Sequence, residues 1–408
     1  MSEAGLQTWK PPLAFSAEKA LQTLQSLCVA PALRAVRATD LLTERARLLG
    51  GQFRHGESFA GTCRLLQARD GTMALNLPRP DDWDLLSAWL ETVGEGLWRW
   101  SDIASVTRQR PIDRLIERGR LLGLALAPTG RRSEHGAAPA GAPAGAPAGR
   151  YDGAQKTRRP RVLDLSALWA GPLCGHLLHL CGADVIKVES TSRPDGARLG
   201  NAEFYGLLNQ GKRCVDLDLR SVEGQRLLNA LIDRADIVIE SSRPRALRQM
   251  GIDPEVLVRQ RARLTWISIT GYGRREPQAN WVAFGDDAGV AAGLSDLMKT
   301  ATGHYEFAGD AVADPLTGIG AALAAWHGWL RGGSSLVSLS LTQVAARSID
   351  EEVDALGEPA VVRNLAAWWR RAQTLDWAAH LPEREVIDPV GIMGADTARV
   401  LEDWNIRC

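Results

Sequence analysis

The sequence predicts an α/β protein in which a large, wound parallel sheet follows a smaller α+β domain at the N-terminus. Three observations support this prediction. A chain of 408 residues is too long for one ordinary core and suits two domains. The run AAPAGAPAGAPAG at residues 137–149 cannot build a core and indicates an extended linker. After this run, apolar strand-like segments alternate with helical ones, the pattern of a parallel sheet with helices on both faces.

The linker divides the chain into three parts. We expect a small α+β domain over residues 1–130, an Ala/Pro/Gly-rich linker over residues 131–158, and a large domain with a C-terminal tail over residues 159–408.

The small domain is expected to combine helices with one tight hairpin. In CRLLQARDGTMALNL, Asp70-Gly71 separates two strand-like runs and is typical of a hairpin turn. Helical patterns cover residues 17–29, 38–49, 83–93 and 112–122.

The large domain is expected to contain a parallel sheet. Four apolar runs, RVLDL, DVIKVE, DIVIES and LTWISIT, are predicted strands, and helices are predicted over residues 172–181 and 222–234. Parallel sheets of this kind bind ligands at the carboxyl ends of their strands, so we expect the functional residues there.

Composition excludes several classes of function. The 48 basic residues cancel the 48 acidic ones, which leaves no net field for nucleic acid or an anionic membrane. The six cysteines form no C-x-x-C pair and the N-terminus lacks a signal sequence, so we expect a cytoplasmic protein. The uncharged run at residues 165–183 contains Gly171 and Pro172, and we expect no membrane span. His176 and His179 lack a third ligand nearby, so no metal is expected.

Six sequence segments occur in an order that suggests a family. They are RVLDLSALWAGPLCGHLLHLCGADVIKVES, RPDGAR, FYGLLNQGKRCVDLDLRSVEG, ADIVIESSRPRALRQMGI, ISITGYG and DPLTGIGAALAA. This succession, over roughly 190 residues, resembles the Rossmann-like domain of the class III CoA-transferases. That family includes formyl-CoA transferases, carnitine CoA-transferases and α-methylacyl-CoA racemases. The resemblance implies a Rossmann-like large domain that takes coenzyme A or acyl-CoA as a substrate, with no permanently bound cofactor.

The resemblance implies that Asp314 is the catalytic nucleophile. A carboxylate can form an anhydride and then a thioester, as transfer of CoA between carboxylic acids requires. In FAGDAVADPLTGIGAALAAWHGWL, Asp314 is similar to the family's aspartate ahead of a small-residue helix, with Gly318 at the family's spacing. Pro315 predicts that the helix begins just after Asp314. The alternatives are a plain N-cap role for Asp314, or Asp310 as the reacting acid.

The residues that would bind CoA are suggested by the same resemblance. The turn of Ala170, Gly171 and Pro172 is similar to the family's turn beneath the nucleotide, where small residues let backbone amides approach phosphate. The alternative for these three residues is an ordinary strand-to-helix turn. For Leu217 and Met250, which the resemblance also suggests, the alternative is core packing. The other matched or candidate CoA-binding residues are Leu217, Met250, Arg193 and Arg248.

A second position separates two reactions of this family. The racemases carry a His-Asp pair where this chain has FGDDAGVAAG, which puts Gly285 at the histidine and Asp286 at the next acid. Glycine cannot exchange a proton, so we expect a transferase and keep Asp286 as a second candidate acid. Asp286 and Asp287 could equally begin a helix. A 2-methylacyl-CoA epimerase and a noncatalytic CoA-binding homologue remain alternatives, because the family's glycine-rich loop has no counterpart here.

The order of segments differs from that of the family. The front segment ARDGTMALNLPRPDDWDLLSAWLE resembles the opening of the family's small domain, which usually follows the large one, and MGADTARVLEDWNI resembles its closing tail. We infer a circular permutation joined through the linker. The resemblance also implies acyl-CoA and a carboxylic acid acceptor as partners, and a homodimer whose chains interlock.

Overall fold

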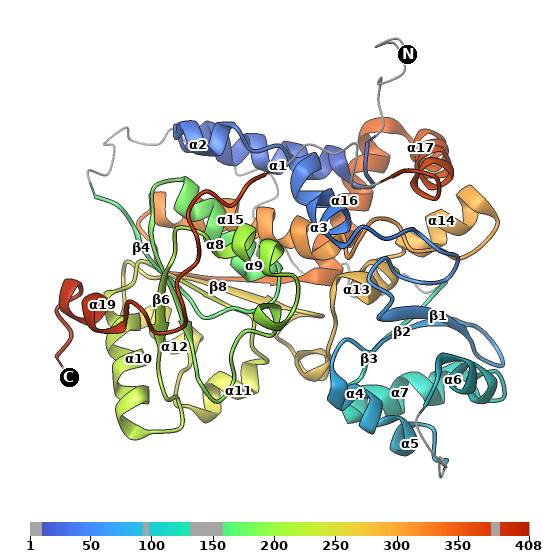
Figure 1. Cartoon of the computed structure of the whole chain (residues 1–408), viewed down its shortest axis with the longest axis horizontal. Coiled ribbons are helices and arrows are strands. Elements are labelled where there is room, and N and C mark those ends of the chain that lie inside the picture. Colours follow the sequence, from blue (N-terminus) through green and yellow to red (C-terminus); the bar gives the residue numbers. More distant parts are fainter. Residues whose placement is uncertain (1–9, 93–97, 131–157, 377–383, 408) are drawn as a thin grey trace.

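A parallel sheet of six strands forms the centre of the computed structural model, which describes residues 10–92, 98–130, 158–376 and 384–407 (Figure 1). Its strand order is β6-β5-β4-β7-β8-β9, and every neighbouring pair is parallel. The direction of winding reverses between β4 and β7, the position at which such sheets open a crevice for ligands. The strands are β4 (Arg161–Asp164), β5 (Asp184–Glu189), β6 (Arg213–Asp216), β7 (Ile237–Glu240), β8 (Thr265–Thr270) and β9 (Ser335–Ser340).

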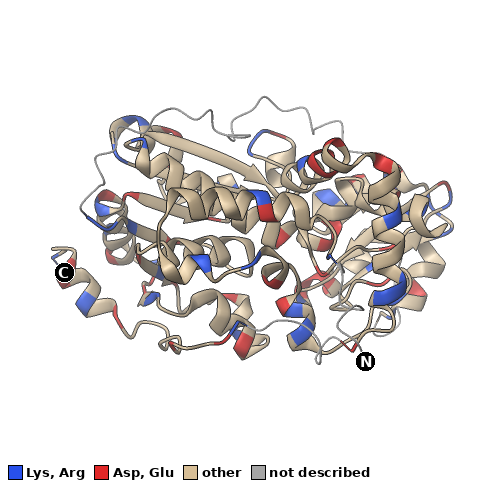
Figure 2. Cartoon of the chain, turned by 90° about the horizontal axis from the view of Figure 1, so that it is seen from above, with Lys and Arg blue, Asp and Glu red and all other residues tan. Residues whose placement is uncertain are grey.

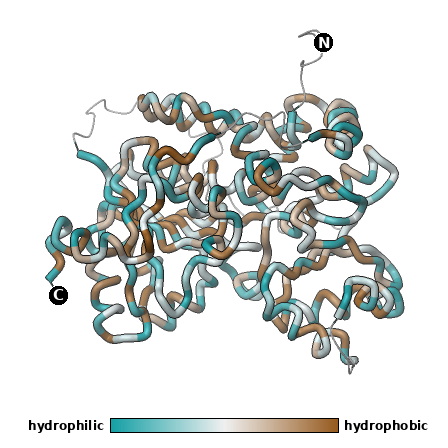
Figure 3. Tube along the Cα trace, in the orientation of Figure 1, coloured by the Kyte–Doolittle hydropathy of each residue, from teal (hydrophilic) through white to brown (hydrophobic). Residues whose placement is uncertain are grey.

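Both faces of this sheet are covered by helices, as the alternating pattern predicted. Successive strand residues point to opposite faces. Val162 therefore lies in one apolar cluster and Leu163 in another, and apolar residues are concentrated along the sheet and its helices in Figure 3. The first face carries α8 (Ala170–Leu180), α15 (Ala313–Leu330) and α16 (Leu341–Leu356), and α17 (Glu358–Ala372) packs against α16. The second carries α10 (Val222–Arg234), α11 (Pro244–Gln249), α12 (Pro254–Gln260) and α19 (Thr397–Asp403).

A small antiparallel sheet lies near the N-terminus, in the order β1-β2-β3. The predicted hairpin at Asp70-Gly71 is confirmed: β1 and β2 pair on either side of it, and the Ala68 amide donates to the Gly71 carbonyl over 2.8 Å. The elements are β1 (Cys63–Gln67), β2 (Thr72–Asn76), β3 (Ala125–Pro128), α4 (Pro80–Asp84), α5 (Leu86–Trp89), α6 (Trp100–Thr107) and α7 (Ile112–Leu122).

One face of the small sheet packs on its own helices, and the other faces the centre of the molecule. Ala74 and Ala127 of the small sheet share an apolar cluster with Val290 of α13 (Gly285–Ala291). The Tyr272 hydroxyl also donates to the carbonyl of Leu126 over 3.2 Å. The small sheet therefore adjoins the segment that contains Asp286. The remaining helices are α9 (Ala202–Asn209) and α14 (Leu294–Thr302).

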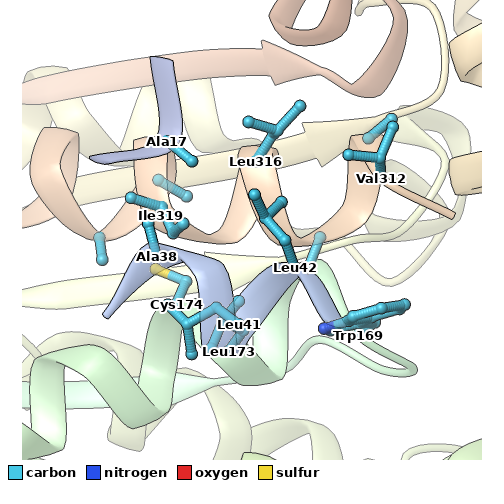
Figure 4. Packing of buried hydrophobic residues seen from close by; sticks show 14 of the residues in the cluster. Ala17, Ala38, Leu41, Leu42, Trp169, Leu173, Cys174, Val312, Leu316 and Ile319 are labelled. Carbon is cyan, nitrogen blue, oxygen red and sulfur yellow. The ribbon is translucent and has the colours of Figure 1, made fainter. Parts of the chain in front are cut away.

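The helices before residue 50 pack on the helices that cover the parallel sheet, rather than on the small sheet. These are α1 (Ala14–Leu27), α2 (Pro31–Arg34) and α3 (Ala38–Leu49). Their buried side chains join the cluster that contains α8 and α15, and Figure 4 shows Leu41 and Leu42 of α3 beside Trp169 and Leu173. The predicted domain boundary at residue 130 groups these helices with the small sheet, because periodicity shows which face of a helix is buried but not what that face packs against.

The C-terminal tail contacts the parallel sheet. The tail returns to β6, where the Cys214 amide donates to Asp396 Oδ2 over 2.8 Å. The predicted linker lies outside the described residues except for its last position. Positively and negatively charged residues are interspersed along the ribbon in Figure 2. Within the described ranges, no helix is long and apolar enough to cross a membrane, and no group of His, Cys, Asp or Glu could hold a metal ion.

Candidate active site

Asp314 lies in the first turn of α15 and its side chain is half-buried. The helix begins at Ala313, one residue before Asp314 rather than just after it, and the N-cap residue is Val312. Asp253 offers a direct contrast, because it also precedes a proline but caps α12, accepting from the Val256 amide over 3.1 Å. Asp314 is therefore not the N-cap of its own helix.

Two other helix N-termini point at the Asp314 carboxylate. The backbone amides of Gly285, the first residue of α13, and Ala170, the first residue of α8, lie near it and lower its pKa. Helix N-termini carry partial positive charge and favour an anion. Gly285 approaches so closely that a β-carbon there would lie 2.4 Å from Asp314 Oδ2 and 2.3 Å from the Ala311 carbonyl oxygen. Glycine is the residue that this approach permits.

Burial and nearby charges set the protonation of this carboxylate. Burial raises the pKa of Asp314 to about 6, while the charge of Arg45 and the amides of Gly285 and Ala170 act in the opposite direction. An acid with this pKa is mostly ionised at pH 7. Asp314 can therefore act as a nucleophile without a separate base.

Asp310, the alternative reacting acid, is held in an ion pair. Its side chain is 1% exposed and accepts two hydrogen bonds from Arg45, one of them from Nε to Oδ2 over 2.8 Å. Among the described residues, no ion pair involves Asp314. The geometry thus leaves the carboxylate of Asp314, rather than that of Asp310, available to react.

Asp286 and Asp287 begin α13 beside Asp314. Asp286 Oδ1 accepts from the Ala311 amide over 3.0 Å, and Asp287 Oδ1 accepts from Asn76 of the small sheet over 3.0 Å. Burial, reinforced by Asp310, raises the pKa of Asp286 to about 7. Burial also raises the pKa of Asp287 to about 7. Both predicted roles of Asp286 fit this position, since it begins a helix and also adjoins Asp314.

The shifted pKa of Asp286 makes a testable difference to stability. Because the folded-state pKa of about 7 exceeds the ordinary value of 3.8, the folded protein holds this proton more tightly than the unfolded chain. The unfolding free energy should therefore fall as pH rises from 4 to 7. We expect Asp286→Asn, which can still accept from Ala311, to raise the unfolding free energy at pH 8 by about 2–4 kcal/mol, and to change it little at pH 4.

Urea unfolding of the wild type and this variant at pH 4, 6 and 8 measures the effect. Asp81→Asn, at an exposed position of α4, is the control and should show no such dependence on pH. An equal change in stability for Asp286→Asn at all three pH values would contradict the assignment.

The predicted turn of Ala170, Gly171 and Pro172 is buried at the start of α8, after β4. A β-carbon on Gly171 would lie 2.2 Å from the side chain of Ser166, so this turn also requires glycine. Two buried lysines donate hydrogen bonds to backbone carbonyls at or near the turn. Lys187 Nζ donates to the Ser166 carbonyl over 3.0 Å, and Lys212 Nζ donates to the Pro172 carbonyl over 2.8 Å.

The turn also lies at the point where the winding of the sheet reverses. The Ala167 amide after β4 donates to Ser241 Oγ after β7 over 3.1 Å. The start of α8 therefore links Asp314 to the carboxyl edge of the sheet.

The other four predicted CoA-binding residues are not gathered around Asp314. Leu217 is buried in the apolar cluster on the second face of the sheet, and Met250 packs against that cluster. Both side chains therefore take part in core packing, and their contact with CoA stays a prediction. Arg193 and Arg248 are exposed, and Arg248 lies 3.6 Å from Glu255.

A small cavity adjoins Asp286, and the charged neighbour Arg45 was not among the predicted site residues. The cavity is lined by Gly285, Asp286 and Val312 among others, and its volume of about 10 Å³ holds about one water molecule. Arg45 reaches the site from α3, and its distance in sequence from Asp310 left no local signal for the pairing.

Comparison with known proteins finds a family match that covers the segment containing Asp314. Residues 160–367 match CoA-transferase family III. The chain is 34% identical over 172 residues to a succinate–glutarate CoA-transferase of Agrobacterium fabrum, which covers 39% of this chain and 43% of that protein. It is 31% identical over 192 residues to a formyl-CoA:oxalate CoA-transferase of Escherichia coli, which covers 44% and 46%. The match spans about half the length of these relatives.

Among solved structures, a CAIB/BAIF family protein from Brucella suis is 28% identical. The alignment covers 48% of this chain and 57% of that chain, with a TM-score of 0.44.

Proposed function

We propose that this chain, which belongs to CoA-transferase family III, moves CoA from an acyl-CoA thioester to a free carboxylic acid through covalent adducts of Asp314. Members of this family use CoA thioesters as substrates. The observation that carries the proposal is the half-buried Asp314 carboxylate, faced by the first amides of α8 and α13 and outside any ion pair among the described residues.

The proposed reaction needs no proton donor and no metal. The Asp314 carboxylate attacks the thioester carbonyl, the C–S bond breaks, and CoA leaves as a thiolate while an acyl-aspartyl anhydride forms. The thiolate then attacks the aspartyl carbonyl, which releases the first carboxylate and leaves an aspartyl-CoA thioester. The acceptor carboxylate and the returning thiolate repeat these steps in reverse order, giving the new acyl-CoA and free Asp314.

CoA is proposed to reach Asp314 along the carboxyl edge of the parallel sheet. The turn at residues 170–172 joins this edge to Asp314, and exposed Arg193 and Arg248 are suited to neutralise the CoA phosphates. Because the cavity beside Asp286 holds about one water molecule, we propose that the pantetheine arm reaches Asp314 from outside this cavity.

An epimerase of 2-methylacyl-CoA is the second candidate. It is favoured by the proximity of Asp286 and Asp314, whose pKa values of about 7 and about 6 suit proton exchange. It is disfavoured by Gly285, which occupies the position of the racemase histidine and has no room for a side chain. A noncatalytic CoA-binding homologue is the third candidate, and it predicts binding of acyl-CoA without turnover.

One incubation separates these candidates. The protein is mixed in D2O with a panel of acyl-CoA thioesters and isotopically labelled carboxylic acids. We expect the labelled acid to appear as its CoA thioester, without deuterium at the α-carbon of the donor. Deuterium uptake in the absence of any acid would indicate the epimerase instead. Binding without either product would support the noncatalytic candidate.

We also propose that the family's domains are circularly permuted here. The small antiparallel sheet precedes the parallel sheet in the sequence but packs directly against α13. The tail at residues 391–407 accepts hydrogen bonds from backbone amides of β6. In this proposal the small domain begins near β1, and α1 to α3 belong to the large domain with which they pack. A homodimer, with interlocked chains, is part of the same proposal and follows from the family alone.

A further inference from the structure

Arg45 enters the candidate site from a helix that lies outside the family-matched residues. On α3 it lies four residues after Leu41 and three after Leu42, so the three side chains share one helical face. Leu41 and Leu42 are buried in the cluster that contains Trp169, as Figure 4 shows. The packing of these leucines therefore places the Arg45 guanidinium near the N-terminal ends of α8 and α15.

The Arg45 guanidinium contacts two segments next to Asp314, the one before α8 and the one before α15. It lies over the Trp169 ring, 4.6 Å from the ring centre, and Trp169 directly precedes Ala170, whose amide lowers the pKa of Asp314. It also holds Asp310 through two hydrogen bonds, and Asp310 lies four residues before Asp314. A planar fork can make both contacts at once, whereas an ammonium group cannot.

We propose that Arg45 is a positioning residue of the active site, which fixes Asp310 against Trp169 and supplies the positive charge that keeps Asp314 ionised. The proposal rests on the proposed function of Asp314. It makes α3, in the N-terminal segment, a necessary part of the active site, although the family match begins only at residue 160.

The charged groups around Asp314 predict the direction of the effect. Arg45 approaches from α3, Asp286 from α13 and Asp310 from the segment before α15, while α8 contributes the Ala170 amide. Cys63 of β1 and Asp287 lie near Asp286. Arg45 is the positive member of this set. Its removal leaves Asp310 and Asp286 to repel a charge on Asp314, so the pKa of Asp314 should rise.

Carbodiimide labelling tests this without any substrate. Carbodiimides activate protonated carboxyl groups, so the pH dependence of labelling at Asp314, resolved from Asp310 by fragmentation of the peptide, reports its titration. We expect Arg45→Gln to move the labelling midpoint upward by about one pH unit or more. Arg45→Lys should keep the midpoint near that of the wild type, because it keeps the charge, but should lower kcat because it loses the fork.

Two further variants keep the test decisive. Arg37→Gln is the matched control, since Arg37 precedes α3, pairs with Asp40 and is largely exposed; it should leave the midpoint unchanged. The double variant Arg45→Gln/Asp310→Asn removes both charges of the buried pair and protects the fold if Arg45→Gln does not fold. Its midpoint should lie between those of the wild type and Arg45→Gln, because the charge of Arg45 acts on Asp314 more strongly than that of Asp310.

Two results would overturn the proposal. One is an unchanged Asp314 midpoint in folded Arg45→Gln, and the other is a double variant that titrates at or below the wild type. Failure of the proposed CoA transfer is recognised separately, because the labelling experiment needs no acyl-CoA. A shifted midpoint in a protein that forms no Asp314 adduct would refute the transfer and leave the role of Arg45 standing.

Discussion

Asp314→Asn is expected to lower the rate of CoA transfer by at least about a thousandfold, because an amide cannot form the anhydride or the thioester. The substitution conserves size and leaves a carbonyl oxygen facing the amides of Gly285 and Ala170. Folding should therefore persist, and binding of acyl-CoA should change little. Initial rates of transfer, with circular dichroism to verify the fold, measure the effect.

Asp253→Asn provides the matched control for this variant. Asp253 is also followed by proline, but it caps α12 and lies away from the carboxylate cluster. Asparagine is a good N-cap residue, so transfer and stability should stay close to those of the wild type. If Asp314→Asn retained more than about a tenth of the wild-type rate, a covalent role for this carboxylate would be untenable.

Gly285→Ala is expected to have the second largest effect, because it places a methyl group where the structure has no space. The added carbon would lie 2.3 Å from the Ala311 carbonyl oxygen, a backbone atom that cannot rotate away. The start of α13 must then move from the start of α15, which withdraws the Gly285 amide from Asp314. We expect a loss of about 1–3 kcal/mol in unfolding free energy. We also expect at least about a hundredfold loss in kcat/KM.

Gly320→Ala tests whether the effect is specific to Gly285. Gly320 lies within α15, and a β-carbon there would meet nothing within 4 Å. Alanine favours helix over glycine, so this variant should be as stable as the wild type or more stable by about 0.5–1 kcal/mol. Equal activity losses in the two variants would show that close packing at Gly285 does not govern the site.

The regular elements could be predicted where sequence periodicity and local turn chemistry act together. α3, α7 and α10 have the predicted bounds, and the Asp70-Gly71 hairpin forms as expected. β9 was absent from the predicted strands, because its run SLVSLS alternates small polar with apolar residues and is less apolar than the other strands. The early start of α15 at Ala313 was also missed, since Pro315 occupies its third position rather than its first.

The candidate site could be predicted only in part, because its contacts join distant segments. Asp314, Asp286 and the turn at residues 170–172 were found through their similarity to the family, and they do lie together. Arg45 was not found, since 265 residues separate it from Asp310 and its helix shows only an amphipathic pattern. Leu217 and Met250 gave no local sign of which face of the sheet they would join.

The most direct measurement is mass spectrometry of the protein after incubation with acyl-CoA mixtures and trapping with hydroxylamine or borohydride. We expect a trapped product on the peptide that contains Asp314, a hydroxamate after hydroxylamine or a homoserine after borohydride, formed with release of CoA or the acyl group. Fragmentation should assign it to this residue, and it should be absent from Asp314→Asn. An adduct at a different residue, or CoA transfer with the Asp314 peptide unmodified throughout turnover, would contradict the proposed mechanism.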